Sequence, residues 1–176
     1  MRKYHVWFAV VVLWVTGVAS ATGQEMMTWT STEGRFTVQL PFVPINQIQQ
    51  KTEEIPLQGT DKGTRHEFWV EVDSGPEFVI YFVMYDDYPP DSTNEAPQVA
   101  LARSRDVWVK GMTLVSDKAI DLNGIPGREW TASNDHANMT ARQFLQGSRL
   151  YSVVVLSSKG ATATLTSQFL NSFKIQ

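Results

Sequence analysis

Hydrophobic and polar residues alternate along much of the chain, a pattern typical of β-strands that bury one face. The clearest case is residues 35–40, where Phe36, Val38 and Leu40 would share the buried face. Similar patterns predict further strands at residues 47–57, 65–73, 78–85, 112–122, 125–133, 139–146 and 149–156.

Two of these strands have compositions that predict their place in the sheet. Residues 78–85 are hydrophobic at almost every position, so both faces of this strand should be covered, near the sheet centre. Residues 47–57 are more polar, which favours a position near an edge. Asn123-Gly124 and Gly147-Ser148 predict two-residue hairpin turns between neighbouring strands.

The periodicity changes to that of a helix in two places. Residues 94–111 have helical spacing, with Asn94 as the expected N-cap, Pro97 in the first turn and Gly111 as the terminator. Residues 161–173 form the second expected helix, because hydrophobic residues recur there along one face. The side chains expected to pack on the sheet are Leu165, Phe169, Leu170 and Phe173.

The predicted order is therefore four strands, a helix, four strands and a helix. Strands joined by hairpins form an antiparallel sheet. We expect an α+β fold, an antiparallel β-sheet with helices packed against it as a sandwich. No linker of distinct composition interrupts residues 28–176, so they should form a single domain after a short tail at residues 22–27.

Residues 1–21 have the three-part composition of a cleaved signal peptide. A short basic start is followed by an apolar run from Val6 to Val18, and residues 19–21 supply the small-x-small cleavage pattern. The apolar run is short for a membrane span. We expect cleavage after Ala21 and no stable membrane span afterwards. The alternative is that this segment is retained as an N-terminal anchor.

Composition limits the possible compartments and activities of the protein. The net charge is −3 and no basic cluster is present, so nucleic acid is not an expected partner. The chain has no cysteine, which excludes disulfides, thiolate metal sites and a cysteine nucleophile. An exported domain without cysteine is more typical of a bacterial envelope than of a eukaryotic secretory pathway. We therefore expect a periplasmic or extracellular bacterial protein.

Four segments together carry a family resemblance. They are residues 29–41, with an aromatic residue, a Gly-containing turn and a Phe-x-Val-x-Leu-Pro strand, and residues 120–129, 147–153 and 169–175. In this order they resemble the PsbP-like superfamily, which includes DcrB-like bacterial envelope proteins. The resemblance spans about residues 28–176 and implies an antiparallel sheet with helices packed on it. It also implies an accessory, assembly or binding role without catalysis.

Few residues outside residues 1–21 have the types and spacing of a catalytic site. His66 and His136 stand next to acids, but adjacent residues of a strand point to opposite faces, so His66 and Glu67 should not pair. No Gly-x-Ser-x-Gly motif is present. The alternative to a non-catalytic protein is an envelope hydrolase whose site is assembled from Asp135, His136 and Arg142.

The acidic segment before the first helix is the candidate cation site. Asp86, Asp87 and Asp91 could supply the several oxygen ligands that hard cations require. The segment lacks the spacing of a calcium-binding loop, and acids are favoured before a helix in any case. We therefore expect an acidic loop that leads into the helix, and no metal or other cofactor.

Trp69 is the candidate partner contact. It shares a strand face with Glu67 and Glu71, opposite the face of Phe68 and Val70. If helices cover that face, Trp69 belongs to the core; if the face is open, Trp69 could anchor a partner.

The sequence thus favours an exported, non-catalytic accessory or binding protein of the cell envelope. Its partner would be another envelope protein or a small ligand. A binder of small apolar ligands is a further alternative, suggested by the aromatic content of 11%.

Overall fold

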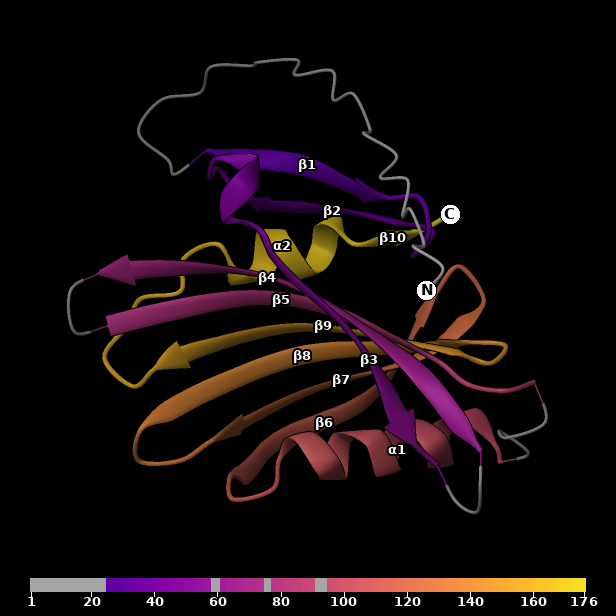
Figure 1. Ribbon diagram of the computed structural model, residues 1–176. Coiled ribbons are helices and arrows are strands. Elements are labelled where there is room, and N and C mark those ends of the chain that lie inside the picture. The colour runs from indigo at the N-terminus through magenta and orange to yellow at the C-terminus, as the bar shows by residue number, and fades with distance from the viewer. Residues whose placement is uncertain (1–24, 58–60, 75–76, 91–94) are drawn as a thin grey trace, which may run out of the picture.

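The computed structural model describes residues 25–57, 61–74, 77–90 and 95–176. Ten strands, two α-helices and a short 3-10 helix are present in these residues (Figure 1). In chain order the elements are β1 (Met26–Ser31), β2 (Phe36–Pro41), the 3-10 helix (Ile45–Gln47), β3 (Gln49–Pro56), β4 (Lys62–Ser74), β5 (Glu77–Asp87), α1 (Pro97–Trp108), β6 (Thr113–Leu122), β7 (Ile125–Ser133), β8 (Ala137–Gln146), β9 (Arg149–Ser158), α2 (Thr166–Ser172) and β10 (Lys174–Ile175).

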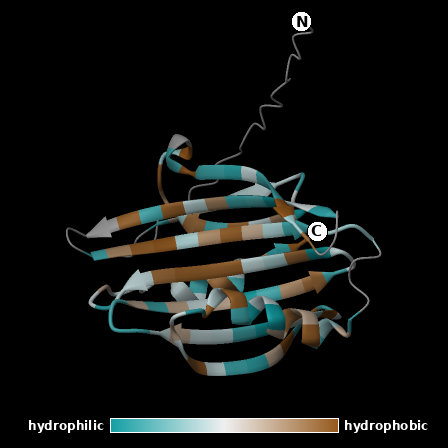
Figure 2. Cartoon of the chain, turned by 60° about the horizontal axis from the view of Figure 1, so that its bottom comes forward, coloured by the Kyte–Doolittle hydropathy of each residue, from teal (hydrophilic) through white to brown (hydrophobic). Residues whose placement is uncertain are grey.

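Seven strands form one large antiparallel sheet in the order β3-β4-β5-β9-β8-β7-β6. The predicted position of β3 at an edge and the predicted interior position of β5 are both confirmed. Both predicted hairpin turns are present, with Asn123, Gly124 and Gly147 at positive φ. Hydrophobic positions recur along the strands of this sheet (Figure 2), as alternation predicts.

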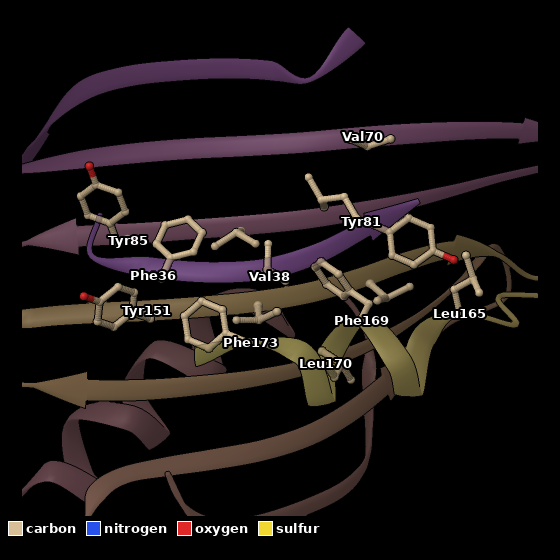
Figure 3. Close-up of a cluster of buried hydrophobic side chains, with 14 of the residues drawn as sticks. Phe36, Val38, Val70, Tyr81, Tyr85, Tyr151, Leu165, Phe169, Leu170 and Phe173 are labelled. Carbon is tan, nitrogen blue, oxygen red and sulfur yellow. The ribbon is translucent and has the colours of Figure 1, made fainter. Parts of the chain in front are cut away.

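One face of the large sheet, which we call the closed face, lies beneath a second layer. That layer is a three-stranded sheet in the order β1-β2-β10, with α2 beside it (Figure 1). From β2, Phe36 and Val38 point toward the large sheet, where they meet Phe169 and Phe173 from the α2 region (Figure 3). The fully buried residues of this core also include Val70, Val83, Tyr85, Tyr151 and Val153.

Helix α1 packs on the opposite face, which we call the α1 face, mainly over β7 and β8. Polar contacts fix the helix there. Ser104 accepts a hydrogen bond of 2.8 Å from the fully buried Gln143 of β8, whose side-chain oxygen accepts one of 3.1 Å from Trp130. Arg105 reaches Asp117 of β6. Gln143 also donates a hydrogen bond of 3.1 Å to Ser152 of β9. A buried amide with these three partners admits one placement of the helix, which positions the residues at its C-terminal end.

The α+β sandwich expected from the sequence is wrong. Strands account for 59% of the described residues and helices for 15%, so the molecule is mostly antiparallel β-sheet. The layer over the closed face is largely the small sheet, in which β1 and β10 were not predicted as strands. The residues of β1 lack strict alternation, and β10 has only two residues. Neither gives a local strand signal.

Both predicted helices exist but are shorter than expected. The N-cap of α1 is Ala96 rather than Asn94, which lies outside the described residues; Pro97 takes the first turn as predicted. Helix α2 covers only Thr166–Ser172, although its four predicted core residues are all buried. The predicted signal peptide and residues 22–24 of the predicted tail lie outside the described residues, whereas Met26 and Met27 belong to β1. Among the described residues, no helix has the length and hydrophobicity of a membrane span.

Candidate binding site

Strand alternation and strand register together build an aromatic surface on the α1 face. Along β4, Glu67, Trp69 and Glu71 point to this face, and the antiparallel register places Trp69 opposite Phe82 of β5. Phe82 in turn contacts Trp108, the last residue of α1. The centroid distances are 6.4 Å for Trp69–Phe82 and 5.7 Å for Phe82–Trp108. We call these three residues the aromatic row.

The aromatic row is neither core nor fully exposed. All three rings are half-buried, as are Ile80 and Leu156 on the same face. The reason is that α1 packs mainly over β7 and β8, and it contacts Phe82 of β5 through Trp108 at its C-terminal end. The part of the face formed by β4 and β5 therefore keeps aromatic and aliphatic side chains partly in contact with water, a feature that marks binding surfaces.

A groove of about 650 Å³ continues from the aromatic row along α1. Trp108 belongs to both, so the two features form one surface. The volume lies in the range of small-ligand and peptide-side-chain sites. The apolar walls of the groove are formed by Leu57, Ala100, Val107, Trp108, Leu145 and Leu150.

The polar groups at the base of the groove hold one another in place. Arg65 donates two hydrogen bonds to Asp86, of 2.8 and 2.9 Å, and the hydroxyl of Tyr88 donates to the same carboxylate at 3.2 Å. Asp86 is 1% exposed. The hydrogen bonds to Asp86 raise the pKa of Arg65, and burial together with the Asp86 charge raises the pKa of Tyr88. The guanidinium therefore stays charged and the phenol protonated at neutral pH.

Some carboxylates at the rim of this surface form ion pairs and others do not. Lys51 pairs with Glu53 at 2.5 Å, and Arg103 pairs with Glu95 at 2.6 Å. Glu67 and Glu71, on either side of Trp69, form no ion pair with another residue that the structure describes. The hydrogen bond to Glu53 raises the pKa of Lys51, and the charge of Glu67 adds a smaller contribution in the same direction.

Two of the three predicted cation ligands are occupied by arginines. Asp86 binds Arg65, and Asp87, on the opposite face of β5, accepts hydrogen bonds of 2.6 and 2.7 Å from Arg149. Asp91 lies outside the described residues. Within the part of the chain that the structure describes, no three acidic or histidine side chains are grouped to hold a metal ion.

The residues of the hydrolase alternative are not brought together. Asp135 and His136 are exposed in the β7–β8 turn, where the side chain of Asn134 caps the backbone N–H of His136 at 2.9 Å. Arg142 lies five residues along β8 from Ala137, roughly 17 Å at the rise of a strand. There it pairs with Glu129 at 2.6 Å on the closed face. His66 also faces the closed side, stacked on Tyr85 at 4.4 Å.

Trp69 and Asp86 are the residues of this surface that the sequence singled out. The structure places Trp69 on a partly open face and Asp86 at the base of the groove, paired with Arg65. Phe82 and Trp108 were missed. Phe82 lies in a run that is apolar on both faces, and Trp108 lies near the end of the predicted helix, between Val107 and Val109. The signal that could have found Phe82 is the β4–β5 register, which follows from pairing 65–73 antiparallel with 78–85.

No family model matches the sequence, and no curated protein matches it. The chain is similar to a crystal structure of PA94 from Pseudomonas aeruginosa, described as a protein of unknown function, at 10% identity. The match covers 81% of this chain and 88% of PA94, with a TM-score of 0.37. A likeness at that level carries no argument about fold or activity, so the functional inference rests on the surface itself.

Proposed function

We propose that this protein is an exported, non-catalytic binding protein of the cell envelope, and that it binds through the aromatic row and the adjoining groove. The observation that carries the proposal is the half-buried row of Trp69, Phe82 and Trp108 on the part of the sheet that α1 leaves uncovered. Aromatic residues with a partly exposed ring face are the usual anchors of protein interfaces.

The chemistry of the groove supports binding rather than catalysis. Its arginine is held by a buried carboxylate, and its tyrosine donates to that same carboxylate. A general base needs a pKa near the working pH, whereas the pKa values of Arg65 and Tyr88 are both raised further from neutrality. These groups are suited to fixing the shape of the groove and to orienting a bound group.

A photo-crosslinking experiment tests this proposal. A benzophenone side chain is introduced at Trp69 and, as the control, at Gln168, which is exposed on α2 beyond the closed face. The variants are expressed in the native cells, fractionated and irradiated. We expect export and a discrete adduct from position 69 with none from position 168. Retention in the cytoplasm, or equal labelling from both positions, would contradict the proposal.

A small apolar ligand is the second candidate, favoured by the volume and the apolar walls of the groove. In that case the crosslinker at position 69 would capture no protein. An environment-sensitive fatty-acid probe would instead bind, and Val107→Asp in the wall of the groove would prevent it. The two candidates are thus distinguished by position: a protein partner would be captured from position 69 in the aromatic row, whereas binding of an apolar ligand would be lost on substitution of Val107 in the groove.

A further inference from the structure

We infer that the occupant of the aromatic row is a basic amphipathic protein segment, whose cationic side chains pair with Glu67 and Glu71 while its apolar side chains lie on Trp69 and Phe82. The inference rests on the proposed function and adds the chemistry of the partner.

The carboxylates and the rings form one pattern because they share a strand. Glu67 and Glu71 each stand two residues from Trp69 on the same face of β4, about 7 Å on either side of it at the rise of a strand. The register sets Glu67 opposite Met84 and Glu71 opposite Ile80. The aromatic row runs across the strands, whereas the two carboxylates lie along β4. A ligand that follows the row from Trp69 to Phe82 therefore meets one carboxylate on each side of its contact with Trp69.

The charge of this surface favours a cationic ligand. The neighbouring cations are engaged, since Lys51 pairs with Glu53 and Arg65 with Asp86. Glu67 lies opposite Lys51 in the β3–β4 register and interacts electrostatically with Lys51 and Arg65 without forming an ion pair. Glu71 has no counter-ion among the described residues. Covering unpaired carboxylates with an apolar or anionic partner would remove their hydration without replacing it, which costs free energy. A partner with lysine or arginine at those two points avoids this cost.

The same charges argue against three other occupants. Anionic lipid headgroups and acidic peptides would be repelled by Glu67 and Glu71. A second copy docking through the same face in a two-fold dimer would place these carboxylates near those of its partner, because such an interface is self-complementary. The overall charge of −3 adds to that repulsion.

The spacing of the rings fits a regular segment. The centroid distances of 6.4 and 5.7 Å are close to the 5.4 Å rise of one helical turn, so apolar side chains one turn apart would meet successive rings. Alternate side chains of an extended segment, about 6.8 Å apart, would also fit. Both a helical and an extended segment therefore fit. What the surface requires of the partner is a regular arrangement of basic and apolar side chains.

Fluorescence anisotropy with labelled 14-residue peptides tests the inference. The probe is an amphipathic Lys/Leu peptide; the comparison peptides have Glu in place of Lys, or the same Lys and Leu in scrambled order. The protein variants are E67Q/E71Q, Trp69→Ala and the control E54Q, which removes an exposed carboxylate on the other side of the sheet. Thermal midpoints of all variants establish that each is folded.

We expect the Lys/Leu peptide to bind at low salt and the Glu peptide not to bind. E67Q/E71Q should weaken binding about fivefold to tenfold, as two exposed ion pairs would, and Trp69→Ala by about tenfold or more. E54Q should leave binding unchanged. Equal binding of the Lys and Glu peptides, both weakened by Trp69→Ala, would overturn the charge inference and keep the binding surface.

Two further outcomes would contradict more than the charge inference. Binding of the Lys/Leu peptide that is insensitive to Trp69→Ala would contradict both the inference and the proposed site. Sedimentation of the protein with phosphatidylglycerol vesicles, abolished by Trp69→Ala, would overturn the basic segment in favour of a lipid surface.

Discussion

The two faces of the large sheet are built from the same alternating pattern but differ in what covers them. On the closed face, the small sheet and α2 bury Phe36, Tyr151 and Phe169 completely. On the α1 face, a single helix covers β7 and β8 and leaves Trp69 and Phe82 half-buried over β4 and β5. A hydrophobic side chain under a complete layer serves stability, whereas one under an incomplete layer is available to a partner.

The charged groups compared on the two faces also differ: Arg149 on the closed face has several partners, whereas Glu71 on the α1 face has no ion-pair partner among the described residues. Arg149, at one end of the closed face, pairs with Asp87, donates to the carbonyl of Glu33 at 2.9 Å and lies 4.4 Å above the ring of Tyr85. Glu71 on the α1 face has none of these partners. The comparison thus predicts that removing buried side chains that pack or pair on the closed face reduces the free energy of unfolding, and that replacing Glu67 or Glu71 on the α1 face affects binding alone.

The largest effect is expected where α2 meets the closed face. Phe169 and Phe173 are 0% and 3% exposed and contact rings of the large sheet, among them Tyr81 and Phe144. Each Phe→Ala change should cost about 3–5 kcal/mol, and a domain of this size is stable by only about 5–15 kcal/mol. Phe169→Ala with Phe173→Ala should therefore leave the protein unfolded or molten, as measured by urea denaturation and near-ultraviolet circular dichroism.

The matched control is Gln168→Ala with Asn171→Ala, on the exposed side of the same helix. Its urea midpoint should stay close to that of the parent. If the double Phe variant unfolds at the parent midpoint, α2 does not pack on the large sheet, and the description of the closed face is wrong.

The next largest effect concerns the buried ion pair below the groove. Asp86→Asn preserves the shape of the side chain but leaves Arg65 without its counter-charge, and breaking a buried pair in this way costs about 3 kcal/mol. Glu54→Gln is the control, since its pair with Lys62 lies in the solvent, and its midpoint should be unchanged. Equal midpoints for the two variants would show that burial does not distinguish these pairs.

A pair of tyrosines on the closed face allows a finer test. The hydroxyl of Tyr151 donates to the carbonyl of Gly34 in the β1–β2 turn at 2.9 Å, whereas the buried hydroxyl of Tyr85 has no hydrogen-bond partner among the described residues. Tyr151→Phe should cost about 1–2 kcal/mol because it leaves a buried carbonyl unpaired. Tyr85→Phe should be neutral or stabilising. The reverse order of urea midpoints would mean that the small sheet is not held through this turn.

The sequence predicted the strands of the large sheet well because alternation is a local signal. It failed for the small sheet, where β2 pairs with β10 across most of the chain, a long-range contact that no local pattern reports. The second helix was predicted too long for a related reason. Its hydrophobic face was correct, but residues 161–165 have a nonhelical backbone although Leu165 is buried.

The candidate site was predictable only in part for the same reason. Trp69 stands out because its neighbours on the same face are charged, whereas Phe82 and Trp108 are hidden within apolar runs. Their meeting depends on strand register and on where α1 docks. The hydrogen bond between Ser104 and Gln143 fixes that docking, and no spacing in the sequence indicates this pair.

Acid should weaken the attachment of α1 to the sheet, because this attachment includes a charged carboxylate. The hydrogen bonds from Arg128, at 2.6 Å, and the charge of Arg105 lower the pKa of Asp117. Because the pKa of the folded state lies below the unfolded value of about 3.9, this contribution is present above about pH 4 and is lost as the pH falls through the folded pKa.

Asp117→Asn should therefore be destabilised relative to the parent at pH 7, by about 1 kcal/mol for a partly exposed pair, and the two should converge toward pH 2. Urea denaturation across that range measures the difference. A difference that stays constant with pH would assign the cost to packing rather than to charge.

The smallest effect on stability, and the sharpest contrast with the closed face, is expected for Glu71. Its carboxylate makes no ion pair with a described residue, so Glu71→Gln should change the free energy of unfolding by less than about 0.5 kcal/mol. Glu129 on the closed face, held by Arg142 and Lys118 at 2.6 Å each, is the comparison, and Glu129→Gln should cost about 1 kcal/mol or more. Urea midpoints measured at pH 7 and low ionic strength would show both. A carboxylate that lies beside a half-buried aromatic ring and contributes nothing to folding is free to pair with a ligand without loss of stability. If Glu71→Gln instead destabilises the protein as much as Glu129→Gln, this charge is part of the fold and the α1 face has no unpaired group to offer a basic partner.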